Sequence, residues 1–309
     1  MPGSRPLTAL LTAALAAMPL TALSLAPLPA SARTITAGPS AIAGSAASRG
    51  APQPASAASS QVILDWERIS FRTVYTENLT PVPIGVPYLG FTSLTMFDAV
   101  DTALDRGGAS GRAAAAQAAH DVLAEYFPAS AAALDADLAT SLAAVPDTRA
   151  RAKGIRIGAS AADEMIAARA DDGRNDTSIV YTRDPGPGVW QPPATGMLAA
   201  WLGYVDLLVL DERVQVDGPD ALTSAEYAAD YDEVRRLGRA TGSERTAYQT
   251  ETALFFNNNS AIMVGLGLVG HLEDHPLPLR RTARLFAALH GAETDSVITA
   301  WRQKYDVGF

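Results

Sequence analysis

The stretch RAAAAQAAHDVLAEYF, residues 112–127, decides the fold. Alanine has the highest helix propensity, and an alanine-rich stretch with few β-branched side chains favours an α-helix. Pro128 follows directly and is expected to end that helix. The flanking segments share the helical period, because large apolar residues recur three or four positions apart at Leu94, Phe97, Val100, Leu104, Leu134, Leu138 and Leu142. Together these patterns predict an all-α fold built as a helical bundle.

Helix-start signals extend this pattern toward the C-terminus. Asp147 is a natural N-cap for the helix that follows Pro146, and Thr223 with Glu226 has the spacing of a capping box. We expect another helix over 245–271. We expect a last helix from Leu279, interrupted near Gly291 and restarting behind Thr294 or Asp295.

Residues 171–219 break the helical pattern. They contain Asp-Asp-Gly, Asp-Pro-Gly-Pro-Gly and Gln-Pro-Pro, which are turn sequences. We expect a long ordered excursion that packs on the bundle through aromatic side chains such as Trp190 and Trp201. Within it, residues 205–210 are either a short strand or an extended apolar run.

The composition excludes several classes of function. The chain has 309 residues, 48% of them hydrophobic, which is enough for a sizeable core and one or two domains. The net charge of −9 and the lack of Lys and Arg clusters argue against nucleic-acid binding, which needs phosphate neutralisation. Cysteine is absent, so disulfides, thiolate nucleophiles and cysteine-based metal sites are excluded.

The N-terminus predicts export. Arg5 precedes an apolar segment over 7–25, and Ala30-Ser31-Ala32 forms a small-x-small cleavage pattern, so residues 1–32 are read as a signal peptide and the protein as secreted. An uncleaved anchor helix is the alternative, which Pro19 and the cleavage pattern disfavour. Residues 33–60 are Ala, Ser, Gly and Pro, which predicts a disordered linker before a folded domain over 61–309.

Four histidines are the obvious candidates for chemistry. His271 and His275 are four residues apart, a spacing that can place two imidazoles on one helical face for a metal. Because Pro276 ends the helix there, a helix-terminal pair interacting with the macrodipole is favoured. His120 lies in the alanine-rich helix and is interpreted as a packing histidine.

Two further patterns favour structural interpretations. Gly265 to Gly270 matches Gly-x-Gly-x-x-Gly without a preceding strand, which indicates close helix packing rather than nucleotide binding. The carboxylates of 171–172 and 230–233 are interpreted as turn or cap groups and as a solvated face.

Several segments together resemble the bacterial vanadium-dependent haloperoxidases, within the type 2 phosphatidic acid phosphatase superfamily. The resemblance spans about residues 61–309 and rests on the shared order and spacing of short pieces. They include 97–99 (FDA), 118–123 (AAHDVL), 169–173 (RADDG), 188–193 (GVWQPP), 231–234 (YDEV), 243–246 (SERT), 253–256 (ALFF) and 300–305 (AWRQKY).

The resemblance implies two four-helix bundles and a site for vanadate, or for phosphate in the phosphatases. Fixed cations and backbone donors hold such an oxyanion. The family supplies them in three motifs, Lys-x6-Arg-Pro, Pro-Ser-Gly-His and Ser-Arg-x5-His. Vanadate acts there as a Lewis acid that activates peroxide for attack by halide. The implied substrates are peroxide, halide and an organic acceptor, or a phosphate ester.

Only the first lysine of these motifs has a counterpart, Lys304. The arginine would fall at position 304 + 7 = 311, two residues beyond Phe309. Arg284 and His290 have Arg-x5-His spacing, but Ala283 replaces the serine and the pair precedes the lysine, so this match is attributed to chance. We expect a domain that is incomplete at its C-terminus, with no catalytic residue and no metal ligand in the chain. Lys304 is then its one cofactor-binding residue.

Three functions remain open from the sequence. The chain is haloperoxidase-like but inactive alone, or an acid phosphatase of the same superfamily, or a non-catalytic secreted helical protein that binds partners through the segment from Trp190 to Trp201. If a partner bundle is missing, apolar helix faces would be exposed and the chain would self-associate.

Overall fold

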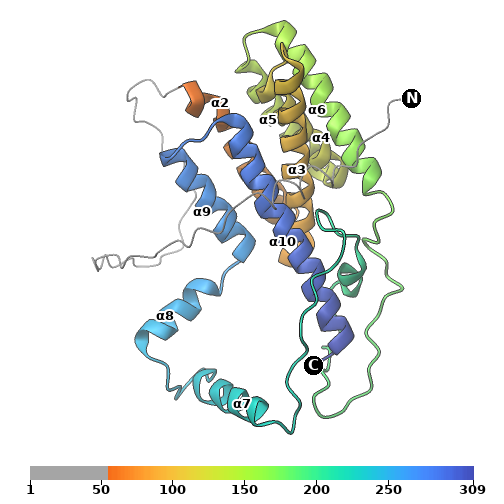
Figure 1. Ribbon diagram of the computed structural model, residues 1–309, viewed down its shortest axis with the longest axis vertical. Helices are drawn as coiled ribbons and strands as arrows, with labels where there is room; N and C mark the ends of the chain where they lie inside the picture. The colour runs from red at the N-terminus through yellow and green to blue at the C-terminus, as the bar shows by residue number, and fades with distance from the viewer. Residues whose placement is uncertain (1–54) are drawn as a thin grey trace.

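The computed structural model of the protein describes residues 55–309, and every regular element in that part is helical (Figure 1). The predicted all-α fold is therefore confirmed. The predicted signal peptide, 1–32, and residues 33–54 of the predicted linker lie outside the described residues. The linker prediction is wrong for residues 55–60, which begin helix α2 (Ala55–Phe71). Alanine and serine can extend a helix in either direction once its apolar part packs on a core.

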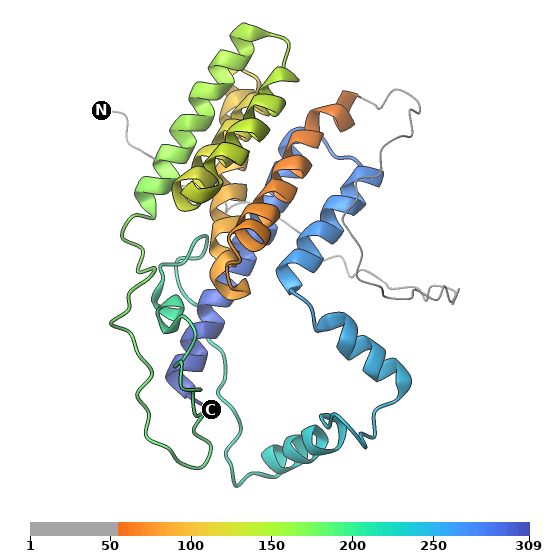
Figure 2. The same ribbon diagram turned by 180° about the vertical axis from the view of Figure 1, so that it is seen from behind.

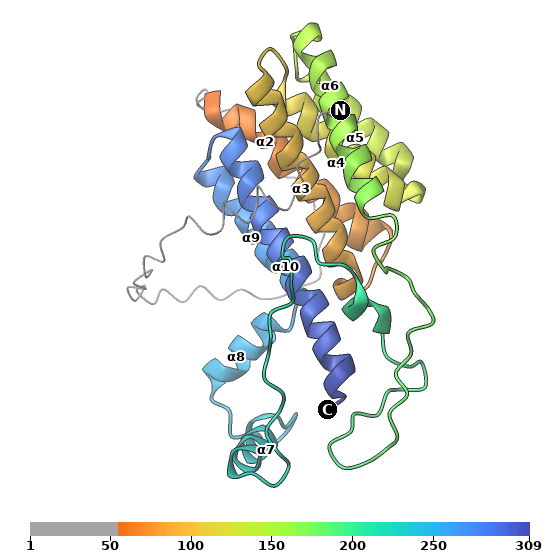
Figure 3. The same cartoon turned by 45° about the vertical axis from the view of Figure 1, so that its right-hand side comes forward.

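The bundle is built around the long helix α3 (Val82–Arg106). Helix α10 (Leu279–Val307) runs beside α3, while α4 (Gly111–Tyr126) and α6 (Thr148–Ala168) pack on it from another side (Figures 1 and 3). Three further helices complete the bundle. In it, α2 contacts α4, α9 (Ser260–Asp274) and α10, and α5 (Ala131–Ala143) contacts α4. Helix α2 continues into a π-helical turn over Arg72–Glu77.

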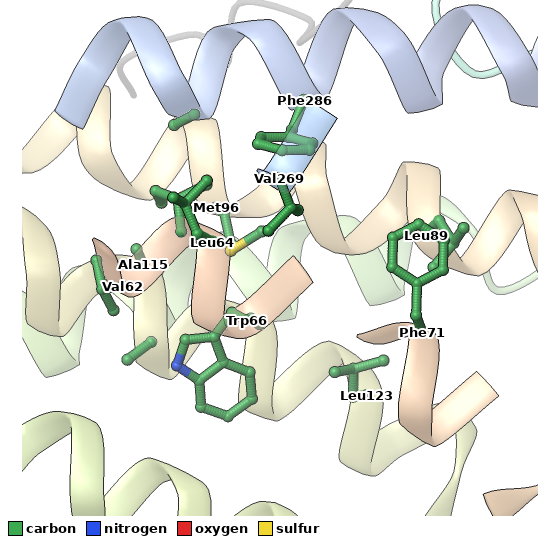
Figure 4. Close-up of a cluster of buried hydrophobic side chains, with 14 of the residues drawn as sticks. Val62, Leu64, Trp66, Phe71, Leu89, Met96, Ala115, Leu123, Val269 and Phe286 are labelled. Atoms are coloured by element: carbon green, nitrogen blue, oxygen red, sulfur yellow. The ribbon is translucent and has the colours of Figure 1, made fainter. Parts of the chain in front are cut away.

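The largest core cluster lies where α2, α3, α4 and α10 meet (Figure 4). Trp66, Phe71, Leu89 and Phe286 are buried in it. Burying each such side chain contributes about 1.5–3 kcal/mol to folding. Trp66 also satisfies its indole N–H, which donates to the hydroxyl oxygen of Ser141 at 3.1 Å.

The helix starts partly match the predicted caps. Asp147 accepts hydrogen bonds from the backbone N–H of Arg149 and Ala150, as predicted. The predicted capping box at Thr223 is wrong, because Ser224 caps helix α7 (Ala225–Leu237) by accepting from the N–H of Tyr227. A complete capping box instead pairs Thr246 with Gln249 at the start of α8 (Ala247–Phe256).

The last two predicted helices have different boundaries from those expected. The helix predicted over 245–271 is divided into α8 and α9, which meet at an angle of 89° across residues 257–259. Three consecutive asparagines occupy that break, and Asn259 caps α9 by accepting from Ile262 N–H. Helix α10 is continuous where an interruption near Gly291 was expected, because packing against α3 and Val209 overrides the weak helix propensity of glycine.

Helices α7 and α8 form an arm that extends away from the bundle (Figure 2). Neither helix contains a buried residue, whereas α9, which follows, packs against α2. No single helix among the described residues is long and apolar enough to cross a membrane, although α8 and α9 pass that test together as a bent pair.

Close packing between α6 and α4 depends on two glycines, which yields a first prediction. A Cβ atom on Gly158 would lie 2.4 Å from the carbonyl oxygen of Ala114. We expect Gly158→Ala to lower the free energy of unfolding by about 1–3 kcal/mol, because the two helices must separate. The matched control is Gly267→Ala in α9, where a Cβ meets no atom within 4 Å.

The control should stabilise the protein by about 0.5–1 kcal/mol, because alanine lowers the entropy of the unfolded chain. Urea unfolding followed by circular dichroism measures both changes. Equal shifts of the same sign would show that the contact between α4 and α6 does not require glycine.

Candidate functional site

Lys304, the predicted oxyanion ligand, lies near the end of α10 with an exposed side chain. Its Nζ sits 4.1 Å from the centroid of the Trp301 ring, which is a cation–π contact. Within the described residues no carboxylate forms an ion pair with Lys304, and the nearby Asp306 pairs with Arg302 at 2.7 Å. The ammonium group is thus oriented by an aromatic face rather than neutralised.

A pocket of about 280 Å³ adjoins Lys304. Apart from this lysine, its lining is apolar: Trp190, Met197, Leu198, Trp301 and Phe309. A tetrahedral oxyanion with several charges needs several cations and N–H donors around it. One ammonium group beside apolar walls does not supply them. The residues present therefore do not by themselves fit vanadate or phosphate.

Aromatic and backbone contacts hold the excursion against the end of α10. The N–H of Trp190 donates to the carbonyl oxygen of Gly308 at 2.8 Å, and the indole N–H of Trp301 donates to the carbonyl oxygen of Leu198 at 3.0 Å. Tyr305 donates its hydroxyl to the carbonyl oxygen of Val180 at 2.9 Å. These contacts confirm the predicted ordered excursion and bring Trp190 next to Lys304.

The base of the excursion is anchored by a buried ionic cluster. Asp172 is only 3% exposed and accepts from Nε of Arg169 at 2.9 Å and Nε of Arg174 at 2.8 Å. Arg169 also donates to the carbonyl oxygens of Asp206 and Leu207. Asp172 is a turn carboxylate, as predicted, because it accepts from the backbone N–H of Arg174, but it is buried between two arginines rather than solvated.

Asp295 anchors a second part of the excursion. A helix restart was expected just after Thr294 or Asp295, but Asp295 lies inside the continuous α10 and is 2% exposed. Its carboxylate accepts from the backbone N–H groups of Leu208, Val209 and Leu210 at 2.6, 3.0 and 2.8 Å. Those N–H groups are thereby satisfied without a neighbouring strand, so residues 205–210 are an irregular apolar run with bends at Leu208 and Val209, neither a strand nor fully extended.

A third polar cluster lies in the core, and no sequence motif predicted it. Glu67 of α2 and His290 of α10 have fully buried side chains, and Glu67 Oε2 lies 3.1 Å from His290 Nε2. Glu293 Oε2 lies 2.8 Å from His290 Nδ1, and the hydroxyl of Ser93 donates to Glu67 Oε1 at 2.8 Å. Burial alone would lower the pKa of His290, but the two carboxylates outweigh it and raise that pKa to about 9.

This cluster reaches solvent at one end only. The side chain of Glu293 is 23% exposed and lines a surface depression of about 540 Å³. The imidazole itself packs between the rings of Phe71 and Phe286, with centroids 5.8 and 6.0 Å away. His290 is therefore inaccessible to an oxyanion, and its Arg-x5-His spacing with Arg284 creates no site.

The other histidines occupy structural positions. His120 bridges Asp121 and Asp135 through its two ring nitrogens, and these carboxylates, Asp121 most strongly, raise its pKa against the opposing effect of burial. His271 and His275 stack at 4.4 Å at the end of α9, where His275 Nδ1 lies 3.1 Å from the carbonyl oxygen of His271.

The predicted carboxylate group at residues 230–233 forms no binding site. Asp232 forms surface ion pairs with Arg235 and Arg236, as expected for a solvated face. Over residues 55–309, no three His, Asp or Glu side chains are grouped so as to hold a metal ion.

Comparison with models of known families, with curated proteins and with solved structures finds no match to this chain.

Proposed function

We propose that this chain is the scaffold part of a haloperoxidase-like protein and that Lys304 is the first cation of its oxyanion site. The single observation that carries the proposal is that the Lys304 ammonium group has no carboxylate partner among the described residues of an acidic chain. An ion pair at this exposed position would add only about 0–1 kcal/mol, so the unpaired ammonium group costs the fold little. A lysine kept unpaired and oriented by Trp301 is available to an anion.

The geometry also limits what this chain does alone. The walls of the Lys304 pocket are apolar, and His290 is enclosed in the core. No second cation and no acid–base histidine accompanies Lys304 in the lining of its pocket. The proposed role of residues 55–309 is therefore to hold and orient Lys304, which is one of the several cations and donors that an oxyanion needs.

A second prediction follows for activity. The recombinant 309-residue chain, given orthovanadate, peroxide and bromide, should brominate monochlorodimedone no faster than vanadate alone. Vanadium-51 NMR should show no line broadening at equimolar protein, because one ammonium group holds the oxyanion too weakly. Turnover by this chain that Lys304→Met abolishes would refute the proposed role of these residues.

The phosphatase alternative uses the same lysine, since phosphate and vanadate share charge and tetrahedral shape. Assays of p-nitrophenyl phosphate hydrolysis and of bromide oxidation, each with and without vanadate, distinguish the phosphatase from the haloperoxidase. The same reasoning predicts no phosphatase activity for the chain alone. Phosphate-ester hydrolysis inhibited by vanadate and lost in Lys304→Met would favour the phosphatase.

A binding role is the candidate from a different class. It is favoured by one observation, the partly exposed Trp190 at the mouth of the Lys304 pocket, where its side chain is 38% exposed. A small ligand bound there would change the fluorescence of Trp190 and Trp301. Trp301 still reports binding in Trp190→Leu, and a weaker affinity measured from its signal is expected if the pocket is a binding site in its own right.

A further inference from the structure

The pocket beside Lys304 is built by two segments that are far apart in the chain. The excursion supplies three of its apolar walls, and the end of α10 with the residues that follow it supplies the other two: Trp190, Met197, Leu198, Trp301 and Phe309. Hydrogen bonds from Trp190 to Gly308 and from Trp301 to Leu198 hold the two segments together. Figure 1 shows the excursion beside the C-terminal end of α10. The pocket is therefore a product of the tertiary structure.

Lys304 carries the one charged group in the lining of this pocket. Its neighbour Asp306 is paired with Arg302, so these two charges balance each other and leave the Lys304 ammonium group unbalanced among the described residues. One polar group within apolar walls is the composition of a small-molecule site, in which a few polar groups orient an apolar ligand. The pocket therefore favours an apolar ligand that carries a negative group.

The charge on that ligand is limited to a single negative charge. A second charge would lose its hydration against apolar walls and gain no second cation in return. An organic cation would be repelled by the Lys304 ammonium group, and a neutral apolar molecule would displace water from that group without replacing its hydrogen bonds. A carboxylate carries one negative charge on two acceptor oxygens, which match the N–H donors of lysine.

The size and the walls of the pocket favour an aromatic body. A water molecule occupies about 30 Å³ in the liquid, so a pocket of about 280 Å³ has room for about nine groups of that size, close to one aromatic ring with a short side chain. Three of the five apolar walls are themselves aromatic, and aromatic rings pack favourably edge to face or offset against one another. Met197 adds a flexible thioether that adapts to the edge of a ring.

We propose that this pocket binds an aromatic monocarboxylate, with the carboxylate on the Lys304 ammonium group and the ring against Trp190 and Trp301. The inference rests on the proposed function in using the unpaired Lys304, and it gives the binding role of the pocket a class of ligand. It requires none of the motifs expected beyond Phe309, because every group that it uses lies in the described residues.

Fluorine-19 NMR of 4-fluorophenylacetate mixed with the intact chain measures such binding even when it is weak. A ligand of this size gains little free energy per atom, so we expect a dissociation constant of about 1 mM. The amine 4-fluorophenethylamine, which carries the opposite charge, should bind roughly tenfold more weakly. Inorganic phosphate at about 10 mM and constant ionic strength should not displace the carboxylate. Equal binding of the amine, or displacement by phosphate, overturns the proposal.

Two pairs of variants test the residues that the proposal uses. Lys304→Met keeps an apolar stem and removes the charge, so it should weaken binding roughly fivefold, while Lys153→Met on α6 should leave it unchanged. Leu198→Ser removes an apolar wall and should weaken binding roughly threefold. Its control is Val180→Ser, outside the pocket, because the two side chains are similarly exposed, at 53% and 56%. Unchanged binding in both Lys304→Met and Leu198→Ser contradicts the proposal.

Lys153 and Lys304 are the only lysines of the chain, so carbon-13 labelling of lysine locates the ligand. Phenylacetate should shift the Cε signal of Lys304 and leave that of Lys153 in place. A Lys304 signal that does not move would place the ligand elsewhere and overturn the proposal. Failure of this pocket and failure of the oxyanion site are separate results. Absence of phenylacetate binding refutes the ligand class alone, whereas the DNA sequence beyond the codon for Phe309 decides the oxyanion site.

Discussion

Replacement of His290 by phenylalanine is expected to lower the free energy of unfolding by about 3–5 kcal/mol, because it leaves the carboxylate of Glu67 buried without a cation. Both side chains are fully buried, so water cannot replace the lost partner without opening the bundle. Phenylalanine has nearly the shape of histidine and would stack on the same rings, so little of the loss would come from packing. Urea unfolding at neutral pH measures the loss in free energy of unfolding.

The double variant Glu67→Met with His290→Phe separates the charge effect from packing. Replacing both members of a buried ion pair by apolar groups of similar size is often nearly neutral. We expect the double variant to recover most of the stability lost by the single one. A double variant less stable than either single variant would show that the cluster stabilises the fold by more than mutual neutralisation.

The same cluster makes stability depend on pH in a predictable direction. The pKa of His290 in the folded protein is raised to about 9, above its ordinary value of 6.5. A raised pKa contributes stability that is fully present below about pH 6.5 and is lost as the pH rises through 9. That contribution is ~3 kcal/mol in the wild-type protein and absent in the double variant. Melting curves from pH 6 to 10 measure the difference.

Replacement of Asp295 by alanine should release the irregular segment that follows the short helix Ala200–Tyr204. Three backbone N–H groups would lose their shared acceptor, and each buried unsatisfied group costs about 1–3 kcal/mol. The segment can escape this cost by detaching from α10 and hydrating, so local opening is expected before global unfolding. We therefore expect at least a hundredfold faster amide exchange at Leu208, Val209 and Leu210.

Hydrogen exchange followed by mass spectrometry measures that opening in a peptide spanning these three residues. Asp295→Asn is the matched control, because asparagine keeps one acceptor oxygen and the volume of the side chain. Its exchange rates should fall between those of the wild type and of Asp295→Ala. Unchanged protection in Asp295→Ala would mean that packing of Val209 alone holds the segment.

The sequence predicts the architecture well where local patterns determine it. The alanine-rich stretch of α4 and the leucine spacing of α5 each lie within one helix, and Asp147 caps α6 as expected. The predicted helix boundaries are wrong where tertiary contacts determine where a helix begins or ends. Gly291 would weaken an isolated helix, but against Val209 and α3 it lies inside a continuous one.

The buried polar clusters were missed because their partners are far apart in the chain. Glu67 and His290 are separated by 223 positions, and no local motif joins them. A signal was present in hindsight. Glu67 lies four positions after the buried Ile63 and three before the buried Ser70, so a carboxylate at a core position of α2 required a partner. Asp295 similarly lies on the buried face of α10.

Sequencing the genomic DNA beyond the codon for Phe309 tests whether Lys304 is the first cation of a haloperoxidase-like oxyanion site. We expect one of the three reading frames to encode an arginine followed by proline, with the arginine seven positions after Lys304. We also expect Pro-Ser-Gly-His and Ser-Arg-x5-His farther on. If none of the three frames encodes these motifs, the proposed role in an oxyanion site is contradicted and Lys304 is an ordinary surface residue.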